Sequence, residues 1–258
     1  MSDLNVTLIQ FPILWENQAA NIRRISKKLE TIRERTDLVV LPEMFTTGFS
    51  MNAAALAEPM EGPSMEWMAD RAGEMGCQLT GSLIISDGRR FFNRMIWMRP
   101  DGTYAYYDKR HLFRMADEHK HYSAGEQRVV VLLGRWRFCL QICYDLRFPV
   151  WSRNRGDYDA LIYVANWPQL RSSAWTALLQ ARAIENQAYV IGVNRVGEDG
   201  TGKSYSGDSA VRGPMGELLS RFETGREAVE TIPISLEALH SFREKFAVLQ
   251  DADPFDIL

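Results

Sequence analysis

The sequence has no long hydrophobic run. Its longest apolar stretches, such as residues 129–133, are far shorter than the roughly 20 residues that a membrane-spanning helix requires. It also has no long basic run, and its formal net charge is -3. Proteins that bind nucleic acid or anionic membranes usually carry a basic surface, so we expect no nucleic acid and no membrane among its partners.

Cysteine is scarce, since the 258 residues include only Cys77, Cys139 and Cys143. An odd count in a long chain does not resemble a disulfide framework and favours a reducing compartment. The first residues, Met-Ser-Asp-Leu-Asn, lead into a strand pattern without a charged leader and an apolar stretch, so we expect no signal peptide. These features predict a cytoplasmic protein.

No Pro/Gly/Ser-rich linker, repeat or low-complexity tract divides the chain. We therefore expect a single domain over residues 1–258, in which 247–258 forms a C-terminal tail. A domain of this length buries roughly three quarters of its unfolded surface, so its core needs no covalent or metal crosslink.

Apolar patterning predicts strands that alternate with helices, with hairpins between them. We expect helices over residues 17–36, 64–75, 173–187 and 236–246. We expect strands over 4–11, 38–41, 77–86, 93–98, 103–107, 129–133, 137–142, 161–165, 189–193, 209–212, 217–222 and 229–234. One open sheet does not carry so many strands comfortably, so the pattern favours an α/β fold with two layered sheets and helices outside.

Three chemically capable side chains, Glu43, Lys109 and Cys143, each follow a predicted strand where it ends. In α/β proteins, ligands bind outside the carboxyl ends of the strands, so these distant residues can meet in one cleft. There a buried carboxylate can act as a base, and a thiol can act as a nucleophile. A lysine can stabilise an oxyanion and lower the pKa of a nearby thiol.

Taken singly, each of these residues also has a structural explanation. Most free cysteines are buried core residues, and Cys139 lies inside an apolar strand. Glu43 can be a surface turn residue, while Lys109 and Glu118 can be solvated charges. The residue types alone therefore leave both interpretations open.

Three motifs in one order resemble the nitrilase superfamily of carbon–nitrogen hydrolases. They are Leu-Pro-Glu43, Asp-Lys109-Arg-His-Leu-Phe113 and Cys143-Tyr-Asp-Leu-Arg-Phe-Pro149. The resemblance runs from residue 5 to about 222 and includes the segments 179–187 and 205–210. It implies a four-layer α-β-β-α sandwich, in agreement with the layered pattern above.

The resemblance also implies a role for each motif residue. Cys143 would attack the amide carbon, and Glu43 would take the thiol proton, give it to the departing ammonia and activate a water against the thioester. Lys109 would face the oxyanion together with the backbone N–H of Tyr144. Glu118 matches the family's second glutamate, which positions the substrate, although its distance from the lysine varies in the family. No metal or organic cofactor is implied.

Among the branches of the family, the chain most resembles the omega-amidases. These enzymes hydrolyse the distal amide of short 2-oxo dicarboxylic acid monoamides such as 2-oxoglutaramate. The stretch 41–51 and the compact length favour this branch. Such a substrate carries a carboxylate, so we expect a cation or several N–H groups in the pocket, and Arg147 is a candidate. The alternative is an arginine that ties the turn after the cysteine together.

Aromatic residues near the motifs are candidates for the pocket wall. They are Phe49, Phe113, Tyr122 and Trp167, of which Trp167 is favoured because it follows a strand. Core packing is the alternative for each. With Tyr144 and Arg147, Trp167 completes the expected substrate-binding set.

Other functions remain open. Another amidase or carbamoylase of the family would act on a deaminated glutathione-like or N-carbamoyl compound. A nitrilase would use the same triad of Glu43, Lys109 and Cys143. A non-catalytic scaffold would have lost a triad residue, whereas all three are intact. A Cys-His hydrolase would use His111 as its base. His119 and His121 beside Glu118 suggest a metal site only weakly, because no further histidine lies nearby.

Besides the small-molecule amide, we expect a second copy of the chain as a partner, since the resemblance implies a homodimer. The tail from Asp251 to Leu258 has no periodicity but contains Phe255, Ile257 and Leu258. We expect it to pack across the dimer interface.

Overall fold

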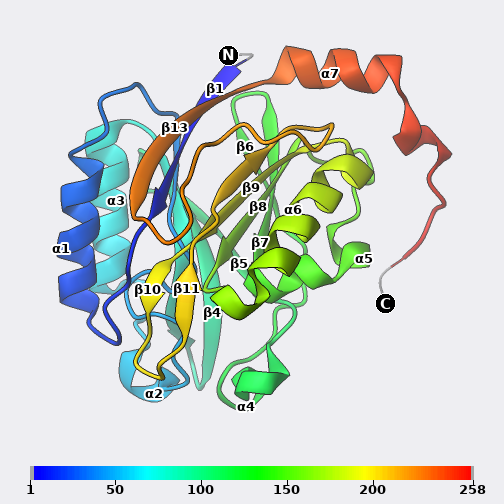
Figure 1. Ribbon diagram of the computed structural model, residues 1–258. Coiled ribbons are helices and arrows are strands. Elements are labelled where there is room, and N and C mark those ends of the chain that lie inside the picture. Colours follow the sequence, from blue (N-terminus) through cyan, green and yellow to red (C-terminus); the bar gives the residue numbers. More distant parts are fainter. Residues whose placement is uncertain (1–2, 257–258) are drawn as a thin grey trace.

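Two β-sheets lie face to face between two layers of helices in the computed structural model, which describes residues 3–256 (Figure 1). One sheet has six strands in the order β13-β1-β2-β3-β4-β5, and the other has five in the order β12-β9-β8-β7-β6. Strands β10 and β11 form a separate pair. The predicted four-layer α-β-β-α sandwich is confirmed.

The six-stranded sheet contains β1 (Asp3–Gln10), β2 (Leu38–Val40), β3 (Gln78–Asp87), β4 (Arg90–Met98), β5 (Tyr104–Asp108) and β13 (Ala228–Ser235). The five-stranded sheet contains β6 (Val130–Leu133), β7 (Trp136–Ile142), β8 (Ala160–Ala165), β9 (Tyr189–Asn194) and β12 (Ala210–Arg212). The separate pair is β10 (Val196–Glu198) and β11 (Ser204–Ser206). The helices are α1 (Gln18–Leu29), α2 (Ala53–Leu56), α3 (Pro63–Met75), α4 (Glu118–His121), α5 (Pro149–Ser152), α6 (Ser172–Asn186) and α7 (Leu236–Lys245).

Local sequence explains several helix ends. The Asn17 side chain accepts a hydrogen bond from the Ala20 N–H at 3.2 Å and so caps α1. Helix α3 begins with Pro63, whose missing N–H would be unpaired there in any case. It ends at Gly76, which adopts a left-handed φ of 63° that glycine tolerates without strain.

Two predicted elements differ from the structure. The first helix ends at Leu29 instead of continuing to 36, although Ile32 still packs against the apolar layer beneath α1. The helical spacing of Ile32 therefore reflects its burial and does not mean that the helix continues to this residue. Residues 217–222 do not form a strand. The Ser220 hydroxyl accepts the hydrogen bond of the Val211 N–H at 3.1 Å, and a single isolated β-bridge joins Leu218 to Arg212 of β12.

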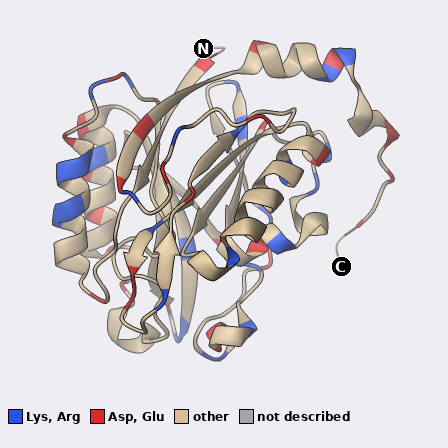
Figure 2. Cartoon of the chain, viewed as in Figure 1, with Lys and Arg blue, Asp and Glu red and all other residues tan. Residues whose placement is uncertain are grey.

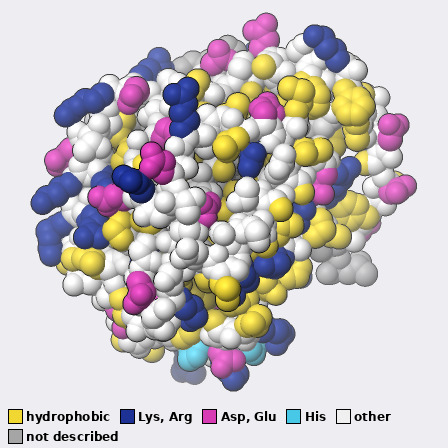
Figure 3. All heavy atoms as spheres, viewed as in Figure 1, with side chains coloured by type: hydrophobic (Ala, Val, Ile, Leu, Met, Phe, Trp, Pro, Cys, Tyr) yellow, Lys and Arg dark blue, Asp and Glu magenta, His cyan; other side chains and the backbone are white. Residues whose placement is uncertain are grey.

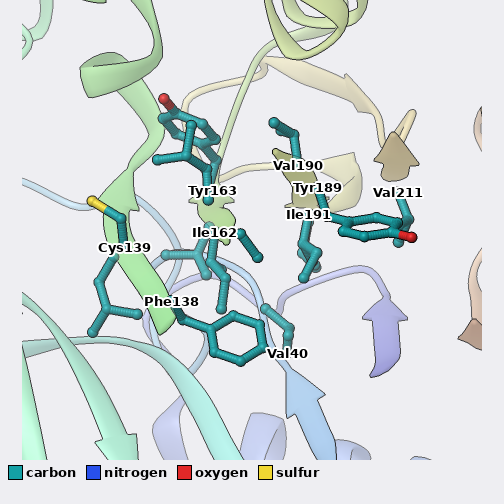
Figure 4. Packing of buried hydrophobic residues seen from close by; sticks show 14 of the residues in the cluster. Val40, Phe138, Cys139, Ile162, Tyr163, Tyr189, Val190, Ile191 and Val211 are labelled. Atoms are coloured by element: carbon teal, nitrogen blue, oxygen red, sulfur yellow. The ribbon is translucent and has the colours of Figure 1, made fainter. Parts of the chain in front are cut away.

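The largest apolar cluster lies between the two sheets. Trp97 of β4 contacts Phe138 of β7 with ring centroids 5.4 Å apart. Figure 4 shows Val40 of β2 near Phe138, with Ile162 and Ile191 from the neighbouring strands beside them. Because this cluster draws on both sheets, neither sheet has a buried inner face without the other.

The outer helices cover the remaining faces. Ile25 of α1 and Met68 of α3 pack on the outer face of the six-stranded sheet in a second apolar cluster. On the opposite side, Trp175 and Leu179 of α6 join the cluster between the sheets through β9. In Figure 1, α1 and α3 lie at one side of the molecule, and α5 and α6 at the other.

Strand directions bring several chain segments to one end of the molecule. Strand β2 runs parallel to β3, and two antiparallel steps, from β3 to β4 and from β4 to β5, give β5 the direction of β2. Strands β7 and β8 are likewise parallel. Glu43, Lys109, Cys143 and Asn166 follow the ends of these four strands.

The surface carries charges of both signs. Figure 2 shows acidic and basic positions interspersed over the helices and loops. Within residues 3–256, no helix is both long and apolar enough to cross a membrane.

The contact between α6 and β9 offers a test of the packing. A methyl group added at Gly192 would lie 2.6 Å from Leu179 Cδ1 and 2.9 Å from Trp175 Cζ2. We expect Gly192→Ala to lower the free energy of unfolding by about 1–3 kcal/mol through overpacking. In the Leu179→Ala background the same change should cost less, and strictly additive effects in chemical denaturation would contradict this packing.

Candidate active site

Glu43, Lys109, Glu118 and Cys143 form one buried cluster. Both glutamates are fully buried, Lys109 is 1% exposed and Cys143 is 9% exposed. The lysine ammonium donates to Glu43 Oε1 at 2.8 Å and to Glu118 Oε1 at 3.0 Å. Cys143 adjoins these groups closely enough for the charges of Glu43, Lys109 and Glu118 all to act on the pKa of its thiol. The structure thus brings together the three motif residues and Glu118.

Backbone contacts hold Glu43 in place. The Asn166 N–H, just past β8, donates to Glu43 Oε2 at 2.8 Å. The next residue, Met44, adopts a left-handed φ of 44°, and its N–H donates to the Ser82 hydroxyl at 2.8 Å. The turn after β2 is therefore tied to β3 and β8, which belong to different sheets.

Cys143 begins a tight turn directly after β7. Its φ of 45° is left-handed, which costs a non-glycine residue about 1–2 kcal/mol. The buried Asp145 carboxylate stabilises the turn by accepting the Ile142 N–H at 3.0 Å. Unusual backbone geometry held by neighbouring groups often occurs at functional sites.

Asp145 also joins the cysteine turn to the segment that carries Lys109. Its carboxylate accepts the Tyr107 hydroxyl at 2.8 Å and the His111 N–H at 3.0 Å, and it contacts His111 Nδ1 at 2.8 Å. The His111 ring stacks on Phe148 with centroids 3.7 Å apart. His111 is therefore bound to Asp145, whereas Glu43 is the charged group with the largest effect on the pKa of the thiol. This geometry favours the glutamate over the histidine as base.

Burial and uneven charge set the proton affinities. Burial and the Glu43 carboxylate raise the pKa of the Cys143 thiol well above its usual value, and the opposing effect of Lys109 is smaller. Burial alone would lower the pKa of Lys109, but Glu118 and Glu43 more than reverse this effect and raise it. Lys109 does lower the pKa of the thiol, as expected, but burial and the two carboxylates outweigh it.

A pocket opens above Cys143, with an empty volume of about 490 Å³ including its mouth. Of the expected residues, Phe49, Phe113, Tyr144, Arg147 and Trp167 line it. Tyr122 does not belong to this lining. Its hydroxyl donates to the Ser50 carbonyl at 2.5 Å, and its ring packs with Met44 and Ile84.

Several pocket residues were missed at the sequence level. They are Ala116, Asn166, Pro168, Arg171, Lys203 and Tyr205. Asn166 follows a strand end, the same signal that singled out Glu43. Arg171 and Lys203 belong to no motif, and only tertiary packing brings them to the mouth.

Glu118 points inward to Lys109 rather than outward to the neighbouring histidines. Its second oxygen accepts the Phe113 N–H at 2.6 Å. Within residues 3–256, no group of three or more His, Cys, Asp or Glu side chains is arranged to hold a metal ion.

The profile of the carbon–nitrogen hydrolase family matches residues 5–244. The chain belongs to this family. It is 48% identical in sequence to omega-amidase YafV of Yersinia enterocolitica over the full length of both chains. The 2-oxoglutaramate amidase of Bacillus subtilis is 32% identical, over 95% of this chain and 96% of the relative.

Solved structures agree with this membership. A CN-hydrolase superfamily protein from Xanthomonas campestris, solved with an arsenic adduct in its active site, is 44% identical and has a TM-score of 0.97 over the whole of both chains. Nit3 of Saccharomyces cerevisiae, a member of branch 10 of the nitrilase superfamily, is 25% identical with a TM-score of 0.85. The alignment with Nit3 covers 95% of this chain and 94% of the Nit3 chain. The resemblance to the nitrilase superfamily is confirmed.

In this carbon–nitrogen hydrolase, Glu43→Gln should have two opposite effects. The pKa of the Cys143 thiol should fall, because the neighbouring negative charge that raises it is removed. Turnover of a small amide should nevertheless fall by about 100-fold or more, because the carboxylate that we expect to act as the base is removed. Thiolate absorbance against pH measures the first effect, and ammonia release measures the second.

His111→Ala serves as the comparison variant, since His111 contacts Asp145 rather than the thiol. It should keep most of the turnover that Glu43→Gln loses. A His111→Ala enzyme without turnover beside a fully active Glu43→Gln enzyme would show that histidine is the base.

Proposed function

We propose that this chain is an omega-amidase that releases ammonia from the distal amide of a small carboxylate-bearing amide such as 2-oxoglutaramate. The observation that carries the proposal is the buried thiol–carboxylate–ammonium cluster at the base of a pocket with cations at its mouth. The names of the relatives from Yersinia enterocolitica and Bacillus subtilis support the same substrate class.

Acylation would begin with the Cys143 thiol close to the amide carbon. Glu43 accepts the thiol proton as sulfur attacks, so no free thiolate forms beside two carboxylates. The carbonyl oxygen becomes an oxyanion, which the Lys109 ammonium and the Tyr144 N–H stabilise. Glu43 then gives the proton to the leaving nitrogen, the carbon–nitrogen bond breaks, and ammonia departs from a thioester on Cys143.

Deacylation would use the same groups. Glu43 takes a proton from a water molecule, whose oxygen attacks the thioester carbon. The carbon–sulfur bond breaks, the thiolate recovers the proton from Glu43, and the carboxylic acid leaves. The Glu118 oxygens already accept hydrogen bonds from the Lys109 ammonium and the Phe113 N–H. Glu118 therefore positions the lysine and the substrate and does not transfer a proton.

The mouth of the pocket suits an anionic substrate. Arg147 stacks on Trp167 with 4.9 Å from Cζ to the ring centroid, and Arg171 stacks on Phe113 at 5.3 Å. Lys203 donates to the Thr201 hydroxyl at 3.0 Å. None of these three cations forms a salt bridge with another residue of the range 3–256. Arginine recognises carboxylates by paired hydrogen bonds, so Arg171 joins Arg147 as a candidate.

Arg171→Ala should raise KM for 2-oxoglutaramate about 10- to 100-fold, which is the usual effect of losing a hydrogen bond to a charged group. Its effect on an uncharged amide of similar length should be small. Arg147→Ala tests the second candidate, and the exposed Arg155→Ala serves as a remote control. Equal losses on charged and uncharged amides would contradict carboxylate recognition.

Competing activities of the same site are separable by direct assay. An N-carbamoyl compound, a deaminated glutathione-like amide and a nitrile can be compared with 2-oxoglutaramate by kcat/KM. Mass spectrometry after brief exposure should show an acyl adduct that the Cys143→Ala variant lacks. A higher kcat/KM for one of the other compounds would replace the omega-amidase proposal.

We also propose a cytoplasmic homodimer. All three cysteines are unpaired thiols, which suits a reducing compartment. Figure 3 shows apolar side chains gathered over the side that carries α5, α6 and α7. Val150, Ile184 and Leu218 on this side are 58%, 51% and 54% exposed. Exposed apolar groups that cluster in this way are typical of protein interfaces.

The tail is part of this proposed interface. Asp251, Ala252, Asp253 and Phe255 border a cavity together with Pro149, Val150, Arg153 and Glu185 of the same chain. Ile257 and Leu258 lie outside the described residues. A chain cut after Gln250 should dimerise more weakly in light scattering at low protein concentration. An unchanged dimer would contradict a role for the tail.

A further inference from the structure

One uncharged side chain contacts both buried glutamates. Asn93 lies on β4 and is fully buried. Its Nδ2 donates to Glu43 Oε1 at 2.7 Å and to Glu118 Oε1 at 3.3 Å. Its backbone carbonyl accepts the Lys109 N–H at 3.0 Å, so Asn93 also contacts the lysine segment.

The contacts of Asn93 and Lys109 close a ring. Lys109 Nζ donates to the same two oxygens, Glu43 Oε1 and Glu118 Oε1, at 2.8 and 3.0 Å. Two donors therefore alternate with two acceptors. Only one of these donors carries a charge, so Asn93 contributes as many hydrogen bonds to the ring as the ammonium does, without adding a second positive charge.

The ring has an excess of negative charge. Two carboxylates share one ammonium, and all three groups are almost wholly shielded from water. Like charges in such an environment favour protonation of one carboxylate. Burial and Glu43 indeed raise the pKa of Glu118 above its usual value. A neutral donor on both carboxylates opposes that protonation, because it binds the ionised forms more strongly.

The rest of the Asn93 side chain does not have the contacts of a structural asparagine. Its Oδ1 atom is buried and has no hydrogen-bond partner among residues 3–256, which is unfavourable for folding. By contrast, the fully buried Asn21 uses both ends of its amide, since Nδ2 donates to the Leu14 and Thr46 carbonyls and Oδ1 accepts the Leu14 N–H. The Asn93 amide is thus placed for the glutamates rather than for its own full pairing.

We propose that Asn93 is a positioning residue whose amide holds Glu43 Oε1 and Glu118 Oε1 against the Lys109 ammonium, so that Glu43 is ready to take the Cys143 proton. This inference rests on the proposed role of Glu43 as the base. Asn93 acts through the glutamates and does not touch the substrate. Loss of its amide leaves the ammonium alone to hold two carboxylates.

The test compares the pH dependence of Asn93→Ala with that of the unchanged enzyme. The variant should lose about 10- to 100-fold in kcat, with a smaller change in KM. The acid limb of its pH profile should move upward by about one pH unit, because a lost donor raises carboxylate pKa values and the base must be ionised. Asn93→Ser, which keeps a donor hydroxyl, should give an intermediate shift.

Asn21→Ala is the matched control, since it removes a fully buried asparagine amide away from the glutamates. It should lower the melting temperature and leave the acid limb unchanged. An Asn93→Ala enzyme whose acid limb stays in place while stability and kcat fall would show that Asn93 is only structural. If Asn93→Ala does not fold, the position of the acid limb in Asn93→Ser decides in the same way.

The rate of Cys143 alkylation by iodoacetamide against pH provides a readout that needs no knowledge of the substrate. The Asn93→Ala profile should shift in the same direction as its turnover profile, and an unshifted profile would contradict the proposal. Full turnover by Glu43→Gln would instead overturn the proposed function. The two failures are therefore distinguishable.

Discussion

The Lys109 ammonium, shared by two buried carboxylates, is the interaction on which the arrangement of the site depends. Its hydrogen bonds join the ends of β2 and β5 to Glu118 at the start of α4. A buried charge is costly unless it is paired, and removing one partner of a buried ion pair typically destabilises a protein by about 3–5 kcal/mol. The chain provides two anions for this one cation, and burial together with this surplus negative charge raises the pKa of the Cys143 thiol. In the proposed reaction, Glu43 therefore takes the thiol proton as the sulfur attacks, whereas many cysteine hydrolases begin from a thiolate.

A second buried carboxylate aligns the nucleophile with that cluster. Asp145 accepts hydrogen bonds from the end of β7 and from the segment after β5, so one side chain holds both the cysteine turn and the lysine segment. The left-handed backbone at Cys143 persists because these bonds offset its strain. His111 belongs to this support, which explains how a histidine close to the site in sequence is not the partner of the thiol.

The sandwich makes such a site possible because strands from two sheets end on the same side. Glu43 and Lys109 follow strands of one sheet, whereas Cys143 and Asn166 follow strands of the other. The apolar cluster between the sheets fixes their separation, as the contact between Trp97 and Phe138 illustrates. The arginines and the lysine at the mouth lie on less regular segments, where a family of enzymes can vary its substrates without altering the reacting groups.

The sequence by itself determined the strands of the two large sheets, though not β10 and β11, most of the helices and the identity of four residues in the cluster. Strand periodicity and strand-end position are local signals, and the motifs around Glu43, Lys109 and Cys143 are short and contiguous. Its failures were of one kind. Ile32 continued a helical spacing outside a helix, Tyr122 packed beside Met44 instead of the pocket, and Asn93 lay unnoticed within an ordinary strand. The tertiary structure decided these points, together with the raised pKa of the Cys143 thiol and the presence of Arg171 at the mouth. The burial, hydrogen bonding and pKa of a side chain depend on which distant segments of the chain come into contact. A local sequence pattern does not contain this information.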